Sequence, residues 1–68
     1  MASLADKFAD NLKSERMRRK LSQEALARKA SLSVSYISML ERGQRTPPLE
    51  TLELLAKALS INPLSLLG

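Results

Sequence analysis

One stretch of the chain combines a helix face of short side chains with basic residues around it. Residues 21–43 read as two short helices with a tight joint between them. The second helix has one face of short or slim side chains that a core does not obviously need: Val34, Ser35, Ser38 and Met39. Basic residues flank that face: Arg16, Arg18, Arg19, Arg42 and Arg45. A helix needs this layout to enter the major groove of DNA while its neighbours hold the phosphates.

Size and composition favour one all-α domain over residues 1–68. The apolar residues are mostly Leu and Ala, which are strong helix formers, and few residues are β-branched. The absence of cysteine excludes a disulfide framework, and the absence of histidine leaves carboxylates as the only usual metal ligands. Acid–base catalysis near neutral pH has few routes without histidine. We therefore expect no enzyme activity, no cofactor and no metal.

The sequence has no feature that indicates export or membrane insertion. The first ten residues lack the basic start and the long apolar run of a signal peptide. No apolar run approaches the ~20 residues of a membrane span. We expect a cytoplasmic protein with no membrane partner.

The basic residues are concentrated around the two-helix motif. Residues 13–45 hold nine Lys and Arg against three Glu, a net charge of +6, whereas the rest of the chain carries −2. A solvated basic surface is the alternative explanation, since such surfaces are common in small proteins. The coincidence of charge and motif favours nucleic acid as the partner.

Hydrophobic spacing and capping residues predict five helices. The first is expected over residues 5–19, with Leu4, Phe8 and Leu12 on one face. A helix-turn-helix is expected over residues 23–42, with Ser22 and Ser33 as the N-caps of its two helices.

The C-terminal helices are expected within residues 49–67, as core and dimer interface. Gly43 is placed to end the preceding helix, and Pro63 opens a short last helix. The fourth helix, over residues 49–59, is expected to turn five side chains inward: Leu49, Leu52, Leu55, Ala56 and Leu59.

These segments resemble the helix-turn-helix domains of lambdoid phage repressors and Cro proteins, the XRE-type family. The resemblance covers residues 8–67 and rests on Leu12 and Arg16, then LSQEALA, LSVSYISMLERG and PPLETLELLAKAL, in the expected order and spacing. It implies a compact five-helix lambda-repressor-like DNA-binding domain. Ser31 and Lys20 stand where the family often has glycine, and Glu15 where many relatives are apolar. Ser31 should adopt φ > 0 with a strain of about 1 kcal/mol, and Glu15 suggests an exposed end to the first helix.

The resemblance assigns contact with base edges to Val34, Ser35, Ser38 and Met39. Valine offers methyl groups to a thymine methyl, whereas a serine hydroxyl donates or accepts and discriminates weakly. None of the four makes a bidentate base contact, so we expect specificity to depend on apolar fit and DNA shape. The alternatives are partial burial of Val34 and Met39 and plain solvent exposure of the two serines.

Phosphate contacts require donors at helix starts and flexible cations. Gln23 is expected at the first position of its helix, where backbone N–H groups are free. The other candidates are Ser33, Tyr36, Arg42, Gln44 and Arg45. Tyr36 has an alternative role in packing against the preceding helix.

Arg16 and Glu41 match a pair that bridges the first and third helices in the family. The resemblance implies that Glu41 orients Arg16, whose remaining donors reach a phosphate. The alternative is two independent surface charges.

Two classes of function fit these features. The first is a sequence-specific regulator that binds double-stranded DNA as a homodimer on a two-fold symmetric operator, with no small-molecule effector evident. Small relatives include Cro-type proteins, restriction–modification controllers and antitoxins. The second is a protein-interaction module on the same fold, such as an antitoxin or co-regulator. Surplus apolar residues near the C-terminus predict the dimer interface: Leu54, Leu64, Leu66 and Leu67.

Overall fold

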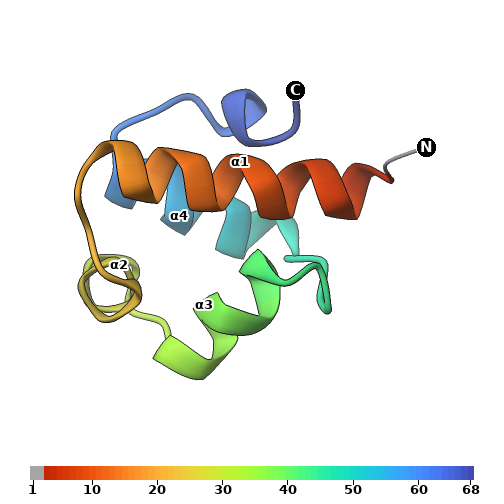
Figure 1. The fold of residues 1–68 in the computed structure, drawn as a ribbon. Helices are drawn as coiled ribbons and strands as arrows, with labels where there is room; N and C mark the ends of the chain where they lie inside the picture. Colours follow the sequence, from red (N-terminus) through yellow and green to blue (C-terminus); the bar gives the residue numbers. More distant parts are fainter. Residues whose placement is uncertain (1–2) are drawn as a thin grey trace.

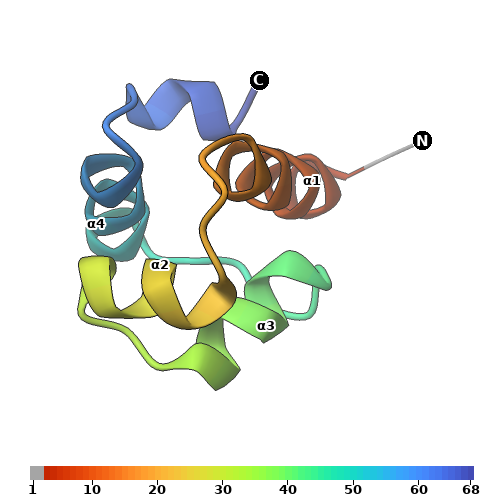
Figure 2. The same cartoon turned by 60° about the vertical axis from the view of Figure 1, so that its left-hand side comes forward.

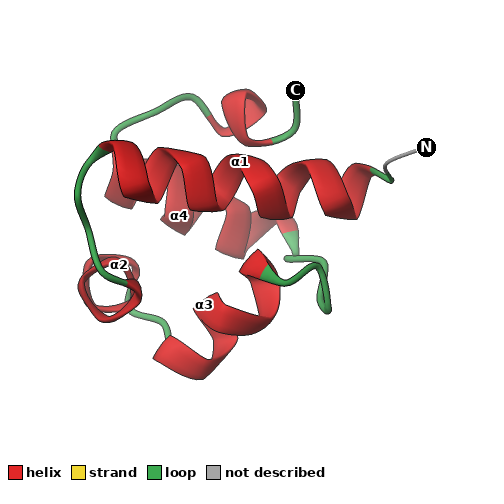
Figure 3. Ribbon diagram, viewed as in Figure 1, coloured by secondary structure: helices red, strands yellow, loops and turns green. Residues whose placement is uncertain are grey.

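The computed structural model describes residues 3–68 as four α-helices followed by one turn of 3-10 helix (Figures 1 and 3). Residues 1 and 2 of the predicted domain lie outside the described residues. The elements are α1 (Leu4–Arg18), α2 (Gln23–Ala30), α3 (Val34–Glu41), α4 (Leu49–Leu59) and η1 (Pro63–Leu66). Between residues 3 and 68, every helix is too short or too polar to cross a membrane.

The predicted count of five α-helices is wrong, because the last segment is a single 3-10 turn. Asn62 begins η1 by accepting a hydrogen bond from the Leu64 N–H at 2.9 Å, and Pro63 supplies its first residue. The first helix begins and ends one residue before its predicted bounds, the helix-turn-helix begins as predicted and ends one residue early, and α4 matches its predicted bounds.

Serine side chains begin three of the helices. The hydroxyl oxygens of Ser3, Ser22 and Ser33 accept the backbone N–H three residues later, at 3.0–3.1 Å. The predictions for Ser22 and Ser33 are thereby confirmed. Ser3 also forms a reciprocal capping box with Asp6, which the sequence reading did not use. Each cap satisfies a donor that a helix start leaves free.

All four α-helices end in the same left-handed turn. The residues with positive φ are Lys20 (56°), Ser31 (59°), Gly43 (74°) and Ser60 (58°). At Ser31, for example, the Leu32 N–H reaches back to the Ala27 carbonyl at 2.8 Å, which is the Schellman pattern. After three of these turns an apolar residue packs against the core: Leu21, Leu32 and Ile61.

Of the four turns, the one with glycine is the turn where space is short. A Cβ on Gly43 would lie 3.3 Å from Asp6 Oδ1 of α1, in addition to the strain of its positive φ. The two serines and the lysine carry that strain at the other turns.

The core lies where α1, α2, α3 and α4 meet, with η1 over one side of it (Figure 2). Its largest fully buried side chains come from every element: Phe8, Leu12, Leu26, Ile37, Leu40, Leu55, Leu59 and Leu66. Leu4 and Leu49, which we expected to face inward, are exposed by 59% and 76%. Each is the first residue of its helix.

The last turn is part of the core. Leu66 is fully buried, and its carbonyl accepts a hydrogen bond from Asn11 Nδ2 of α1 at 3.1 Å. The prediction that Leu66 lacks an internal partner is therefore wrong. In a 3-10 turn, Pro63 and Leu66 share one side, so Leu64 points outward and is exposed by 71%.

Relieving the strain at the end of α4 should stabilise the fold. We expect Ser60→Gly to raise the free energy of unfolding by about 0.5–1 kcal/mol, because glycine adopts positive φ without a steric cost. The matched control is Ser14→Gly in the exposed interior of α1, which should lower it by about 0.5 kcal/mol. Urea denaturation followed by circular dichroism measures both. A destabilised Ser60→Gly variant would contradict the assignment of strain to this turn.

Candidate nucleic-acid interface

Two eight-residue helices, α2 and α3, form a helix-turn-helix joined by residues 31–33 (Figure 1). Ser31 takes the left-handed conformation that reverses the chain, as predicted. Leu32 is half-buried against the core, and Ser33 caps α3. The turn is thus fixed by one strained residue, one apolar contact and one hydrogen bond.

The two sides of α3 differ in chemistry. Ile37 and Leu40 are fully buried. On the other side, Val34 is exposed by 39%, Ser35 is exposed, and Ser38 and Met39 are half-buried. Among residues 3–68 the side chains of these four make no hydrogen bond or ion pair. We call them the outward face of α3.

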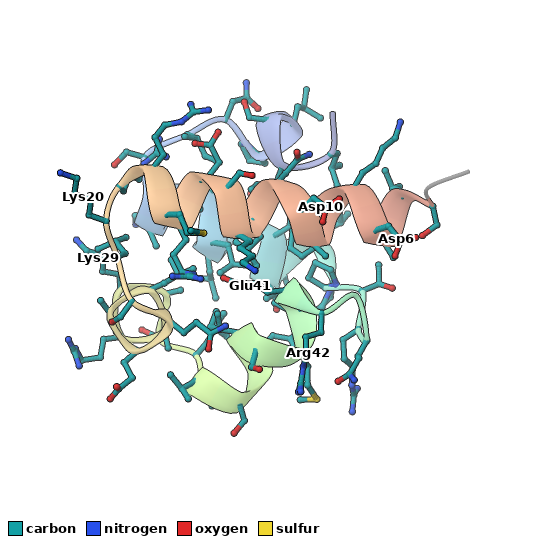
Figure 4. The ribbon with its side chains drawn as sticks, in the orientation of Figure 1. Asp6, Asp10, Lys20, Lys29, Glu41 and Arg42 are labelled. Carbon is teal, nitrogen blue, oxygen red and sulfur yellow. The ribbon has the colours of Figure 1, made fainter. Side chains whose placement is uncertain are left out.

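Polar side chains extend this face beyond the end of α3. Arg42, Gln44 and Arg45 are exposed, and the described residues place no carboxylate oxygen within 4.0 Å of either arginine. Figure 4 shows Arg42 at the C-terminal end of α3, away from α1. Tyr36 is half-buried and packs against the core. Packing was the predicted alternative to phosphate binding for this residue.

The arginines at the end of α1 are in a different situation. Arg19 forms an ion pair with Glu15 one turn earlier, and Arg18 lies 3.5 Å from the same carboxylate. The Glu15 side chain is only 15% exposed, whereas Met17 and Arg18 in the last turn of α1 are exposed, as expected for the end of this helix. Arg18 and Arg19 are therefore partly neutralised.

Arg16 and Glu41 form an ion pair between α1 and α3. Arg16 Nε donates to Glu41 Oε2 at 2.7 Å, and Arg16 Nη2 donates to Oε1 at 3.1 Å. The side chains are only 13% and 4% exposed. Figure 4 shows Glu41 on the side of α3 that faces α1. Two parallel bonds between planar groups fix both distance and direction.

Two further hydrogen bonds join this pair to the start of α2. Arg16 Nη1 donates to the Leu21 carbonyl at 2.7 Å, and Gln23 Nε2 donates to Glu41 Oε1 at 3.1 Å. From the sequence, Gln23 was predicted to bind a phosphate, and its hydrogen bond to Glu41 was not predicted. The sequence signal for this hydrogen bond was the position of Gln23 as the first residue of α2, next to the segment that Arg16 contacts.

The comparisons with known proteins agree with this geometry. The helix-turn-helix family model HTH_3 matches residues 12–66. The chain is 46% identical over 57 residues to the immunity repressor protein of Bacillus phage phi105, a match that covers 84% of this chain and 40% of that protein. It is 45% identical over 47 residues to control protein C.BamHI of Bacillus amyloliquefaciens, covering 69% and 58%. The chain thus spans about half the length of these curated relatives.

Solved structures give the same result. The restriction-modification controller protein C.AhdI from Aeromonas hydrophila superposes with a TM-score of 0.89 at 42% identity, covering 91% of this chain and 94% of that one. C.Esp1396I bound to a 25 base pair operator site superposes with a TM-score of 0.86 at 32% identity, covering 97% and 87%. The chain belongs to the helix-turn-helix family HTH_3, the group of repressor- and Cro-like domains. The predicted resemblance is confirmed.

Removing one partner of the buried pair should destabilise the fold. We expect Arg16→Met to lower the free energy of unfolding by about 3 kcal/mol, because Glu41 keeps a buried charge without its cation. Adding Glu41→Met should recover most of that loss. Arg18→Met is the control, since the Arg18 side chain is 72% exposed and lies 3.5 Å from Glu15, so that its ion pair is worth less than about 1 kcal/mol. Urea denaturation decides the matter, and a double variant as unstable as Arg16→Met would refute this account of the pair.

Proposed function

We propose that this chain is a sequence-specific transcriptional regulator that inserts α3 into the major groove of a two-fold symmetric operator as a homodimer. The observation that carries the proposal is the outward face of α3, whose side chains are free within residues 3–68 and lie next to Arg42 and Arg45, which have no carboxylate partner there. C.Esp1396I, which shares the fold at 32% identity, was solved on a 25 base pair operator site. That relative supports the same target for this chain.

The outward face of α3 reads base edges in this proposal. Val34 contacts a thymine methyl, Ser35 and Ser38 bond base edges, and Met39 supplies an adaptable apolar contact. The face carries no charge, so electrostatic attraction comes from the residues around it. Discrimination then depends on fit and on the shape of the duplex.

Phosphates are held on both sides of that face. At the start of α2, Ser22 satisfies the N–H groups of Ala25 and Leu26. The N–H groups of Gln23 and Glu24 have no acceptor within residues 3–68, and they suit a phosphate oxygen. Further phosphates are bound beyond the end of α3 by Arg42, Gln44 and Arg45. The hydroxyl groups of Ser33, at the start of α3, and of Tyr36, in its first turn, also bind phosphate.

Arg16 has less freedom to bind phosphate than the flanking arginines. Three of the five N–H groups of a guanidinium are engaged within the protein. One N–H on each terminal nitrogen remains, on a side chain that is 13% exposed. We propose that Arg16 adds one phosphate contact of fixed direction.

Selection of bound duplexes from a random pool tests the function. We expect enrichment of one two-fold symmetric sequence, and Val34→Arg should shift one position of each half-site toward guanine. Arginine bonds guanine O6 and N7 bidentately, with about 1–3 kcal/mol of discrimination. The control is Ser14→Arg, which adds the same charge on the exposed side of α1 and should leave the motif unchanged. A pool without enrichment would refute sequence-specific binding, and an unchanged motif would remove Val34 from the reading face.

The homodimer is proposed to form through the C-terminal turn. Leu64 is the most exposed residue of the predicted interface, Leu67 is half-buried, and Leu54 is exposed by 43%. Leu66 belongs to the core and is not included. Each subunit measures 31 × 23 × 22 Å, so two subunits side by side suit half-sites about 34 Å apart. A shared interface also adds stability that a small core lacks.

Leu64→Asp should convert the dimer to a monomer and weaken binding to a two-half-site operator. A buried aspartate at the interface has no cation to pair with, so its desolvation opposes association. Sedimentation equilibrium at micromolar concentration measures the mass. The control is Leu4→Asp, which changes an exposed leucine at the start of α1, outside the proposed interface, and should remain a dimer. A monomeric wild-type chain, or a dimeric Leu64→Asp variant, would rule out this interface.

A further inference from the structure

Glu41 is the point where three helices are joined by hydrogen bonds. Its carboxylate, on α3, accepts two bonds from Arg16 of α1 and one from Gln23 of α2. The Glu41 side chain is 4% exposed, so these donors replace water almost completely. A buried carboxylate needs such donors, because its charge is otherwise uncompensated.

The same network holds the backbone that leads into α2. Arg16 Nη1 donates to the carbonyl of Leu21, the residue before the N-cap Ser22. Gln23, the first residue of α2, is tied to Glu41 by its side chain. The start of α2 is therefore held on both sides of its cap, once from α1 and once from α3.

We propose that Gln23 is a positioning residue, whose side chain orients the start of α2 through Glu41 and does not itself bind phosphate. This inference rests on the proposed DNA-binding function. Its basis is that the amide nitrogen of a half-buried side chain points to a buried carboxylate, 3.1 Å away. The groups offered to DNA at this point are the backbone N–H groups of Gln23 and Glu24. Their direction depends on how α2 is tilted against α3.

The consequence is that Gln23 matters for DNA binding only while Glu41 is present. Methionine has a similar length and shape but no donor, so Gln23→Met removes the bond and leaves the packing. We expect operator affinity to fall about tenfold, as for the loss of a hydrogen bond to a charged group. In an Arg16→Met, Glu41→Met background, Gln23→Met should change affinity by less than twofold.

Four proteins form a double-mutant cycle that tests the proposal: the wild type, Gln23→Met, the double-methionine variant, and the double-methionine variant with Gln23→Met. Their operator affinities are measured under conditions where each protein is folded. A similar tenfold loss in both backgrounds would overturn the proposal, because the amide would then bind phosphate directly. Ala9→Gly is the control for general loosening, since it weakens α1 far from the network. An equal loss of affinity in Ala9→Gly would also overturn it, since affinity would then follow stability alone.

A measurement on the free protein separates this proposal from the proposed function. Amide hydrogen exchange at Ala25 and Leu26 reports opening at the start of α2. Gln23→Met should speed exchange there severalfold more than at Leu55 in α4, and no such difference should appear in the double-methionine background. Uniform acceleration, or none, would overturn the positioning role. If the local effect appears but no DNA is bound, the proposed function fails and the role of Gln23 in α2 stands. This readout also decides the question if the double-methionine background does not fold.

Discussion

The position of α3 relative to the rest of the fold depends on the buried pair of Arg16 and Glu41. Apolar contacts alone leave a short helix free to slide, since several arrangements bury similar area. A planar guanidinium and a carboxylate bond well in one arrangement only, and removing either leaves a buried charge. The pair joins α1 to the end of α3 and, through Leu21 and Gln23, to the start of α2. The helix-turn-helix thus presents its outward face in one orientation.

The turns between helices complement that constraint by local means. Each α-helix ends in a left-handed residue, and after three of them an apolar residue returns to the core. The exception is Gly43–Gln44, where the following residue is exposed and the chain passes close to Asp6. That turn leaves Gln44 and Arg45 free at the edge of the proposed DNA surface. The same motif therefore serves packing at three turns and frees polar side chains at the fourth.

Much of the fold could be predicted from the sequence because its signals are local. Leucine spacing, the serine caps before α2 and α3, and Gly43 define helix ends without reference to distant residues. Predictions of burial were wrong where the burial of a side chain depends on residues far along the chain. Leu4 and Leu49 have the spacing of core residues, but each is the first residue of its helix and is exposed. Leu66 looked surplus, yet Asn11, distant in sequence, anchors its turn and places it in the core.

The candidate site divides in the same way. The sequence by itself determined the all-α class, the helix-turn-helix, the small uncharged face of α3 and the family, because each follows from residue type, order and spacing along the chain. Only the tertiary structure decided that Arg18 and Arg19 share Glu15, that Arg16 is nearly buried, and that the Gln23 side chain turns to Glu41. A side chain's partner depends on which helices meet around it, and the burial of a charge depends on every segment that excludes water from it.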